Sequence, residues 1–161
     1  MRFWDSSGLV PLLVSEKASR RMRALYRSDG ELVTWWGSLV ECDSALARLE
    51  REGALKARAA ALARRRLDTL CEHWHEVQAA DPLREHARRL LRAHPLRAGD
   101  ALQLSAALRV AEHQPSTLPF VCLDERLSAA ADREGFPVVG IGRVRTPSRS
   151  KAARRGGPLG R

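Results

Sequence analysis

Four acidic side chains, far apart in the sequence, occupy positions from which they could act together. Asp5 and Asp124 each end a short apolar stretch, and Glu41 and Asp100 stand near the starts of two predicted helices. In a parallel sheet the carboxyl ends of the strands, and the helices that follow them, share one edge. We therefore expect Asp5, Glu41 and Asp124 to face a common crevice, which Asp100 joins if its helix packs there.

Such a cluster of acids would need a proton or a cation to exist. Two like charges about 4 Å apart repel by about 4 kcal/mol at an effective dielectric of 20. Carboxylates gathered in a crevice therefore take up protons or bind a cation. Oxygen ligands favour a hard ion, Mg²⁺ or Mn²⁺, over zinc. Because Mg²⁺ retains water, the site could supply a nucleophile to a phosphodiester. Ser6 could donate the hydrogen bond that orients Asp5, or it could equally cap the first helix.

Each acid also has a purely structural interpretation. Asp5, Asp100 and Asp124 could serve only as helix N-caps. Ser38 and Glu41 fit a capping box, with Glu41 at the third helical position. The joint pattern favours chemistry over four separate caps, but the sequence leaves both interpretations open.

The elements that must position these acids alternate regularly along the chain. Apolar periodicity and turn residues divide it into short strands and longer helices. The predicted strands cover residues 2–4, 31–36, 76–79, 120–123 and 137–141, and the predicted helices cover residues 6–14, 16–28, 38–52, 55–74, 82–93, 97–113 and 125–134. This alternation predicts an α/β fold, with a parallel sheet covered by helices on both faces.

Composition fits one folded domain. A chain of 161 residues with 44% hydrophobic residues can build one real core. No apolar run is long enough to span a bilayer, and the first residues lack the pattern of a secretory signal. The three cysteines have no zinc-site spacing and are expected to be reduced. We therefore expect a cytoplasmic protein without membrane contact.

The net charge of +9 is concentrated at the C-terminal end. From residue 141 onward there are seven basic residues and no acid, which leaves 21 basic and 19 acidic residues in the first 140. Residues 142–161 are rich in Gly, Pro and Ser and are predicted to be a basic, disordered tail outside a folded domain at residues 1–141. The tail could hold nucleic acid non-specifically or only aid solubility.

The four segments that contain the acids resemble, in order, the acidic blocks of PIN domains. They read FWDSSGLVPLL, SLVECDSALARL, RAGDALQLSAAL and FVCLDERLSAAADREGFPVV. The likeness extends over roughly residues 1–141 and is nearest to VapC-type toxins of bacterial type II toxin–antitoxin pairs. It implies a three-layer α/β/α fold with a central parallel sheet.

This resemblance also implies an activity and a site. The family members are Mg²⁺- or Mn²⁺-dependent endoribonucleases that hydrolyse RNA phosphodiester bonds. By likeness, Asp5 and Asp100 would be the principal metal ligands, and Glu41 and Asp124 would complete the site directly or through water. Cys122 stands where the family often has Thr or Ser, which puts one polar contact beside the metal site in question. The implied partners are a cognate antitoxin and a second copy of the chain.

Arg51, Arg58 and Arg65 recur every seven residues and predict a basic stripe on neighbouring helices. The stripe could contact RNA phosphates, or it could be an ordinary solvated face.

The alternative to a nuclease is a catalytically silent PIN-like module that binds RNA or a partner, since a fold alone does not fix an activity. The presence of all four acids favours the enzyme. A serine hydrolase is not indicated, because the chain has no Gly-x-Ser-x-Gly.

Overall fold

A parallel sheet lies at the centre of the computed structural model, which describes residues 1–112 and 114–140. Its strands within these residues are β1 (Arg2–Trp4), β2 (Leu32–Trp35), β3 (His75–Val77), β4 (Phe120–Val121) and β5 (Val138–Val139). They lie in the order β3-β2-β1-β4-β5, and every neighbouring pair is parallel. The predicted tail at residues 142–161 lies outside the described residues.

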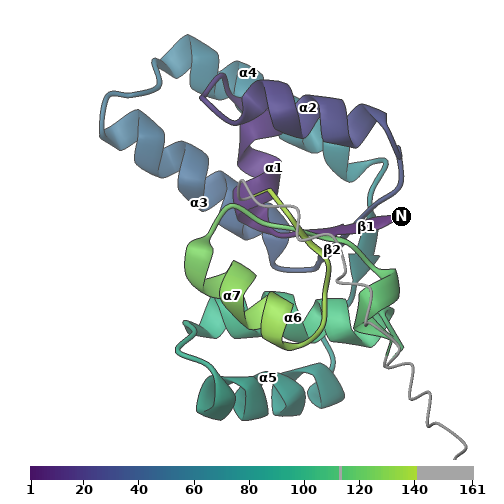
Figure 1. The fold of residues 1–161 in the computed structure, drawn as a ribbon. Coiled ribbons are helices and arrows are strands. Elements are labelled where there is room, and N and C mark those ends of the chain that lie inside the picture. Colours follow the sequence, from purple (N-terminus) through teal and green to yellow (C-terminus); the bar gives the residue numbers. More distant parts are fainter. Residues whose placement is uncertain (113, 141–161) are drawn as a thin grey trace, which may run out of the picture.

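Helices cover both faces of this sheet (Figure 1). One face is covered by α1 (Ser6–Leu13), α2 (Ser19–Arg27), α3 (Ser38–Arg51) and α4 (Ala57–Cys71). The other is covered by α5 (Asp81–Ala93), α6 (Ala98–Val110) and α7 (Glu125–Arg133). A short 3₁₀ turn at Pro115–Thr117, which the sequence did not predict, precedes β4. The predicted three-layer α/β/α fold with a central parallel sheet is therefore confirmed.

The two cores follow from the alternation of side chains along each strand. Phe3 and Phe120 stack with ring centroids 5.4 Å apart and face the α5–α7 layer. Their neighbours Trp4 and Val121 belong to the core of the α1–α4 layer. Because β1 is buried on both faces, the residue that follows Trp4 emerges at the sheet's carboxyl edge with helices on either side.

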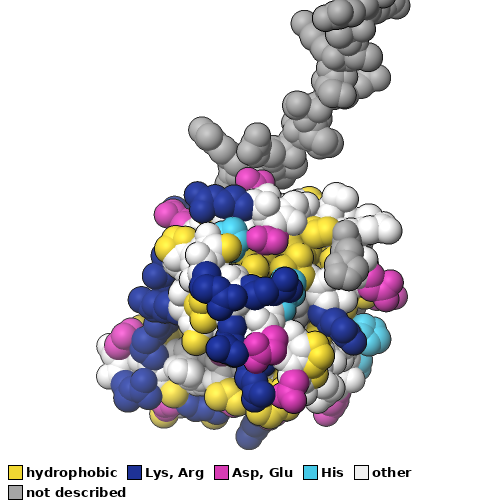
Figure 2. All heavy atoms as spheres, turned by 90° about the horizontal axis from the view of Figure 1, so that it is seen from below, with side chains coloured by type: hydrophobic (Ala, Val, Ile, Leu, Met, Phe, Trp, Pro, Cys, Tyr) yellow, Lys and Arg dark blue, Asp and Glu magenta, His cyan; other side chains and the backbone are white. Residues whose placement is uncertain are grey.

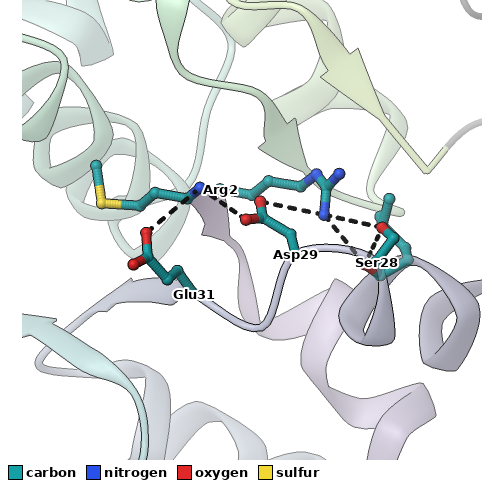
Figure 3. Close-up of polar contacts among 6 residues, drawn as sticks. Arg2, Ser28, Asp29 and Glu31 are labelled. Atoms are coloured by element: carbon teal, nitrogen blue, oxygen red, sulfur yellow. Dashed lines mark hydrogen bonds and ion pairs between the residues drawn. The ribbon is translucent and has the colours of Figure 1, made fainter.

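Charged groups close the opposite edge of β1 (Figure 3). The ammonium group of Met1 lies 2.8 Å from Asp29 Oδ1 and 3.7 Å from Glu31 Oε2. The guanidinium of Arg2 lies 3.2 Å from Asp29 Oδ2 and donates to the Leu25 carbonyl at 3.0 Å. These contacts join the start of β1 to the turn between α2 and β2.

The outer surfaces of the helices are strongly charged. Figure 2 shows Lys and Arg side chains recurring across the face seen from below, with Asp and Glu side chains among them. On α5, Arg84 pairs with Asp81 at 2.9 Å, and Arg88 pairs with Glu85 at 3.0 Å. In the part of the chain that the structure describes, no helix combines the length and apolar character needed to cross a membrane.

Candidate active site

Asp5 stands at the point where β1 ends and α1 begins. As the N-cap of α1, its Oδ2 accepts a hydrogen bond from the Ser7 backbone N–H at 3.0 Å. The Ser7 hydroxyl also donates to Oδ2 and accepts from the Leu123 N–H at 2.8 Å. The structural interpretation of Asp5 as a helix cap is therefore correct, and one of its oxygens is fully engaged in that role.

The sequence assigned the orienting contact to Ser6, whereas Ser7 makes it. An N-cap side chain accepts from the second or third residue of its helix, and Ser7 is the second. Ser6 instead lines the cleft described below. The hydroxyl that faces Asp5 is thus set by helix geometry rather than by adjacency in sequence.

Asp5 is only 4% exposed, and burial raises its pKa from 3.8 to about 6. The charge of Glu41 acts in the same direction, while the hydrogen bonds from Ser7 oppose it. Burial also raises the pKa of the Cys122 thiol well above its ordinary range, so the thiol stays protonated. Its Sγ lies 3.5 Å from Asp5 Oδ2 and donates to it. Cys122 thus supplies a weak donor where a hydroxyl would supply a stronger one.

Glu41 lies in the first turn of α3 without capping it. The N-cap is Gly37, and it makes no side-chain cap hydrogen bond. Glu41 Oε2 instead accepts from Gln103 Nε2 of α6 at 2.7 Å, and Gln103 Nε2 also donates to Ser38 Oγ at 3.0 Å. The capping-box interpretation of Ser38 and Glu41 is therefore wrong, because both side chains turn toward α6 rather than to their own backbone.

Asp100 and Asp124 begin the last two long helices. Asp100 Oδ2 accepts from the Arg97 N–H at 3.1 Å, and Asp124 Oδ1 accepts from the Leu127 N–H at 2.9 Å. Asp124 is therefore an N-cap, as Asp5 is. The N-cap interpretation of Asp100 is wrong, because Arg97 is the N-cap of α6 and Asp100 is the third helical residue, whose side chain accepts from the N-cap backbone. Each of the four acids uses one carboxylate oxygen in these bonds, and the other oxygen accepts none from the described residues.

A cleft of about 750 Å³ opens at this edge of the sheet. Among the predicted site residues, Ser6, Glu41, Arg51 and Asp100 line it. Asp5 is buried at its side, electrostatically coupled to Glu41 but outside the lining. A Cβ on the neighbour of Asp100 in sequence, Gly99, would lie 3.2 Å from Glu41 Oε1, so the unbonded oxygen of Glu41 faces the start of α6.

Asp124 also lies outside the lining, although the residue before it, Leu123, belongs to it. Glu41 and Asp100 therefore line the cleft itself, whereas Asp5 and Asp124 do not.

Three arginines line the same cleft, and they differ from the predicted stripe. Arg51 is joined by Arg48 and Arg97, while Arg58 and Arg65 lie exposed on α4, outside the lining. The turn after α3, where Gly53 adopts a φ of +74°, reverses the chain and breaks the seven-residue repeat. Arg48 could have been found from Glu41, since residues seven apart share a helix face.

Within the described residues, no ion pair joins Asp5, Glu41 or Asp100 to a basic group. The donor set consists of carboxylate oxygens, which suits Mg²⁺ or Mn²⁺. As the side chains stand, no group of three or more His, Cys, Asp or Glu residues in residues 1–112 and 114–140 is close enough to hold a metal ion. The donor atoms thus fit a hard cation in type. Binding one would require two or more of these carboxylates to move closer together.

Comparisons with known proteins place this geometry in context. No family model matches the sequence. The chain is 29% identical over 136 residues to the Mycobacterium tuberculosis protein named Ribonuclease VapC49, and the match covers 84% of this chain and 92% of that protein.

Solved structures are similar in fold. Mycobacterium tuberculosis VapC20, described as a Sarcin-Ricin loop cleaving toxin, matches with a TM-score of 0.60 and 22% identity over 84% of this chain and 96% of that chain. A toxin–antitoxin complex from Klebsiella pneumoniae matches with a TM-score of 0.57 and 14% identity over 86% of this chain and 96% of that chain. The predicted resemblance to VapC-type PIN proteins is confirmed.

Proposed function

We propose that this chain is a metal-dependent endoribonuclease that hydrolyses RNA phosphodiester bonds, acting as the toxin of a toxin–antitoxin pair. One observation carries the proposal. Glu41 and Asp100 line one cleft and Asp5 is buried beside it, each with a carboxylate oxygen that no described residue bonds and without an ion pair to a described basic group. Such an uncompensated set of acids is what a divalent cation requires.

The residues that would hold Mg²⁺ or Mn²⁺ are Asp5, Glu41 and Asp100, with Asp124 as a contributor from the start of α7. When bound, the ion would polarise a phosphate oxygen and make a water molecule more acidic. Asp5 offers the oxygen that Ser7 and Cys122 leave unbonded, in a position fixed by the N-terminus of α1.

In this proposal the acids of the cleft act on the phosphate that is cleaved, and the arginines bind the neighbouring phosphates of the RNA. Arg48, Arg51 and Arg97 line the same cleft, and none of them forms an ion pair with a described residue. Guanidinium groups bind phosphate through two parallel hydrogen bonds. We infer that these arginines hold the RNA backbone on either side of the cleavage point, and that Arg58 and Arg65 contribute at most long-range attraction.

The relatives support the substrate class. VapC49 is named a ribonuclease, and VapC20 is described as cleaving the Sarcin-Ricin loop. A structured RNA with an exposed loop is therefore the first substrate to try, because a loop can be splayed into a cleft.

The test is cleavage of such an RNA in Mn²⁺ or Mg²⁺, with and without a chelator. Wild type should cut only with the metal ion. Glu41→Gln and Asp100→Asn should each lose activity by about 10²-fold or more, the scale for groups that act on developing charge. The matched control, Asp29→Asn at the opposite edge of the sheet, should cut normally. Cleavage that ignores the chelator or survives both substitutions contradicts the proposal. RNA binding without cleavage in wild type supports a silent binding module instead.

Two protein partners belong to the same proposal. One similar structure is a toxin–antitoxin complex, which supports an antitoxin as the regulator of this chain. Trp36 is 52% exposed, and Leu39 and Val40 are exposed beside it at the start of α3. These apolar side chains suit either an antitoxin segment or a second copy of the chain. Light scattering after size-exclusion chromatography would test the homodimer, and an Asp substitution at Val40 should weaken it if this surface forms the interface.

A further inference from the structure

Gln103 is a polar side chain placed inside the core of α6. It is 1% exposed and sits among buried apolar neighbours of the same helix, including Leu104 and Ala107. Burying an amide is costly unless its groups are hydrogen-bonded. Its nitrogen makes two hydrogen bonds, to Glu41 and Ser38, while its Oε1 is buried without a partner in the described structure.

The partners fix which way the amide points. A carboxylate only accepts hydrogen bonds, so the group that lies 2.7 Å from Glu41 Oε2 must be the NH₂. The reverse orientation would set two acceptor oxygens against each other and leave the nitrogen without its acceptor. The unpartnered Oε1 is therefore the cost of directing both N–H donors toward α3.

These donors belong to a chain of hydrogen bonds that reaches β1. Thr34 Oγ1 lies 2.8 Å from the Trp4 carbonyl and 2.6 Å from Ser38 Oγ. Since a carbonyl only accepts, the Thr34 hydroxyl donates to Trp4 and the Ser38 hydroxyl donates to Thr34. The Ser38 oxygen in turn accepts from Gln103. Four elements are thereby joined, and the chain ends on the residue directly before Asp5.

This arrangement is poorly explained by packing alone. A methionine or leucine at position 103 would fill a similar volume in an apolar core without burying an orphaned oxygen. The amide gains only from what it holds. The amide donates to Oε2 of Glu41. The other carboxylate oxygen of Glu41, its Oε1, faces the start of α6 near Asp100 and accepts no hydrogen bond from the described residues.

We propose that Gln103 is a positioning residue that holds Glu41 in place for binding a divalent cation together with Asp5 and Asp100. The proposal rests on the proposed function, because it takes Glu41 to be a ligand of that cation. Partners that orient metal ligands contribute about 10- to 100-fold to metal affinity. Removing the donors of Gln103 should therefore weaken cation binding in that range while leaving the fold intact.

The test measures Mn²⁺ binding directly, from the electron paramagnetic resonance signal of free Mn²⁺ over the full-length protein without RNA. Gln103→Met and Gln103→Leu both remove the donors, and either one that gives a wild-type circular dichroism spectrum suffices. The matched control is Ser105→Ala on the same helix. Ser105 is buried as deeply, but its hydroxyl donates to the Leu83 carbonyl of α5 at 2.8 Å, away from the cleft.

The expected result is a Mn²⁺ dissociation constant that is 10- to 100-fold larger for the Gln103 variants than for wild type, and one that changes by less than about twofold for Ser105→Ala. In a Glu41→Gln background, Gln103→Met should weaken binding no further, because the residue acts through Glu41. Equal Mn²⁺ affinity of Gln103→Met and wild type overturns this inference and leaves the nuclease proposal standing. Absence of Mn²⁺ binding to wild type overturns both.

Discussion

The two edges of the sheet carry the same kind of side chain in opposite electrical surroundings. At the amino edge, Asp29 and Glu31 lie beside the Met1 ammonium group and the Arg2 guanidinium (Figure 3). At the carboxyl edge, Asp5 and Glu41 face each other's charge, and no cation among the described residues pairs with either. Asp29 and Glu31 are near neighbours in the sequence, whereas Asp5 and Glu41 come from distant parts of the chain that the fold brings together.

The difference shows which acids serve the fold and which weaken it. Ion pairs at the amino edge hold β1 against the turn before β2. At the carboxyl edge, burial and the charge of Glu41 raise the pKa of Asp5, which means that its ionised form is disfavoured in the folded protein. A protein keeps such an unfavourable group where function requires it, and shifted carboxylates cluster at functional sites. Substitutions at the two edges should therefore change stability with opposite signs.

The largest effect is expected at Asp5. Its pKa is about 6 when folded and 3.8 when exposed, so between these values the unfolded chain releases a proton that the folded protein retains. Stability from this group is therefore lost as pH rises from about 4 to 6, and the loss amounts to about 3 kcal/mol. Asp5→Asn, which still caps α1, should match wild type near pH 4 and exceed it by about this amount at pH 7.5 without metal ion.

Urea unfolding at a series of pH values, in the presence of a chelator, measures this difference. Comparing the two proteins at each pH removes the contributions of other titrating groups. If the difference in unfolding free energy between Asp5→Asn and wild type stayed constant from pH 4 to 8, folding would not disfavour the ionised form of Asp5.

A divalent cation should reverse the penalty at the carboxyl edge. Wild type at pH 7.5 should be stabilised by Mn²⁺, by about 2.7 kcal/mol when the ion is present at 100 times its dissociation constant. Asp5→Asn should gain much less, because the neutral amide is a poorer ligand. Thermal unfolding across a Mn²⁺ titration checks this, with NaCl at the same ionic strength as a control for screening. Equal stabilisation of both proteins would place the ion elsewhere.

The sequence predicted the layers of the fold and the neighbourhood of the acids more closely than it predicted their contacts. Short apolar stretches such as Phe120–Val121 are bounded by turn residues and leave little choice of element. A strand end determines where Asp5 lies but not which hydroxyl reaches it, and that contact went to Ser7. The role of Gln103 depends on the packing of α6 against α3, which local periodicity does not reveal.

The arginines illustrate the same limit over a longer distance. A repeat of seven residues describes one helix correctly, so Arg58 and Arg65 do share a face of α4. The repeat does not extend across the reversal after α3. The arginines that line the cleft with Arg51 are instead Arg48 and Arg97. Contacts made within one element could be predicted, whereas contacts between elements required their packing.

The smallest effect is expected at the amino edge, where Asp29→Asn tests the other half of the comparison. The Asp29 side chain is 22% exposed and accepts from the Met1 ammonium at 2.8 Å, with Arg2 at 3.2 Å. Partly exposed ion pairs contribute about 0.2–1 kcal/mol, so the substitution should destabilise the protein by no more than that at pH 7.5. The loss should shrink in 1 M NaCl, where such charges are screened. Urea unfolding at low and high salt measures both values. A gain in stability on removing Asp29, like the gain expected on removing Asp5, would mean that the two edges of the sheet do not differ in the way their charges indicate.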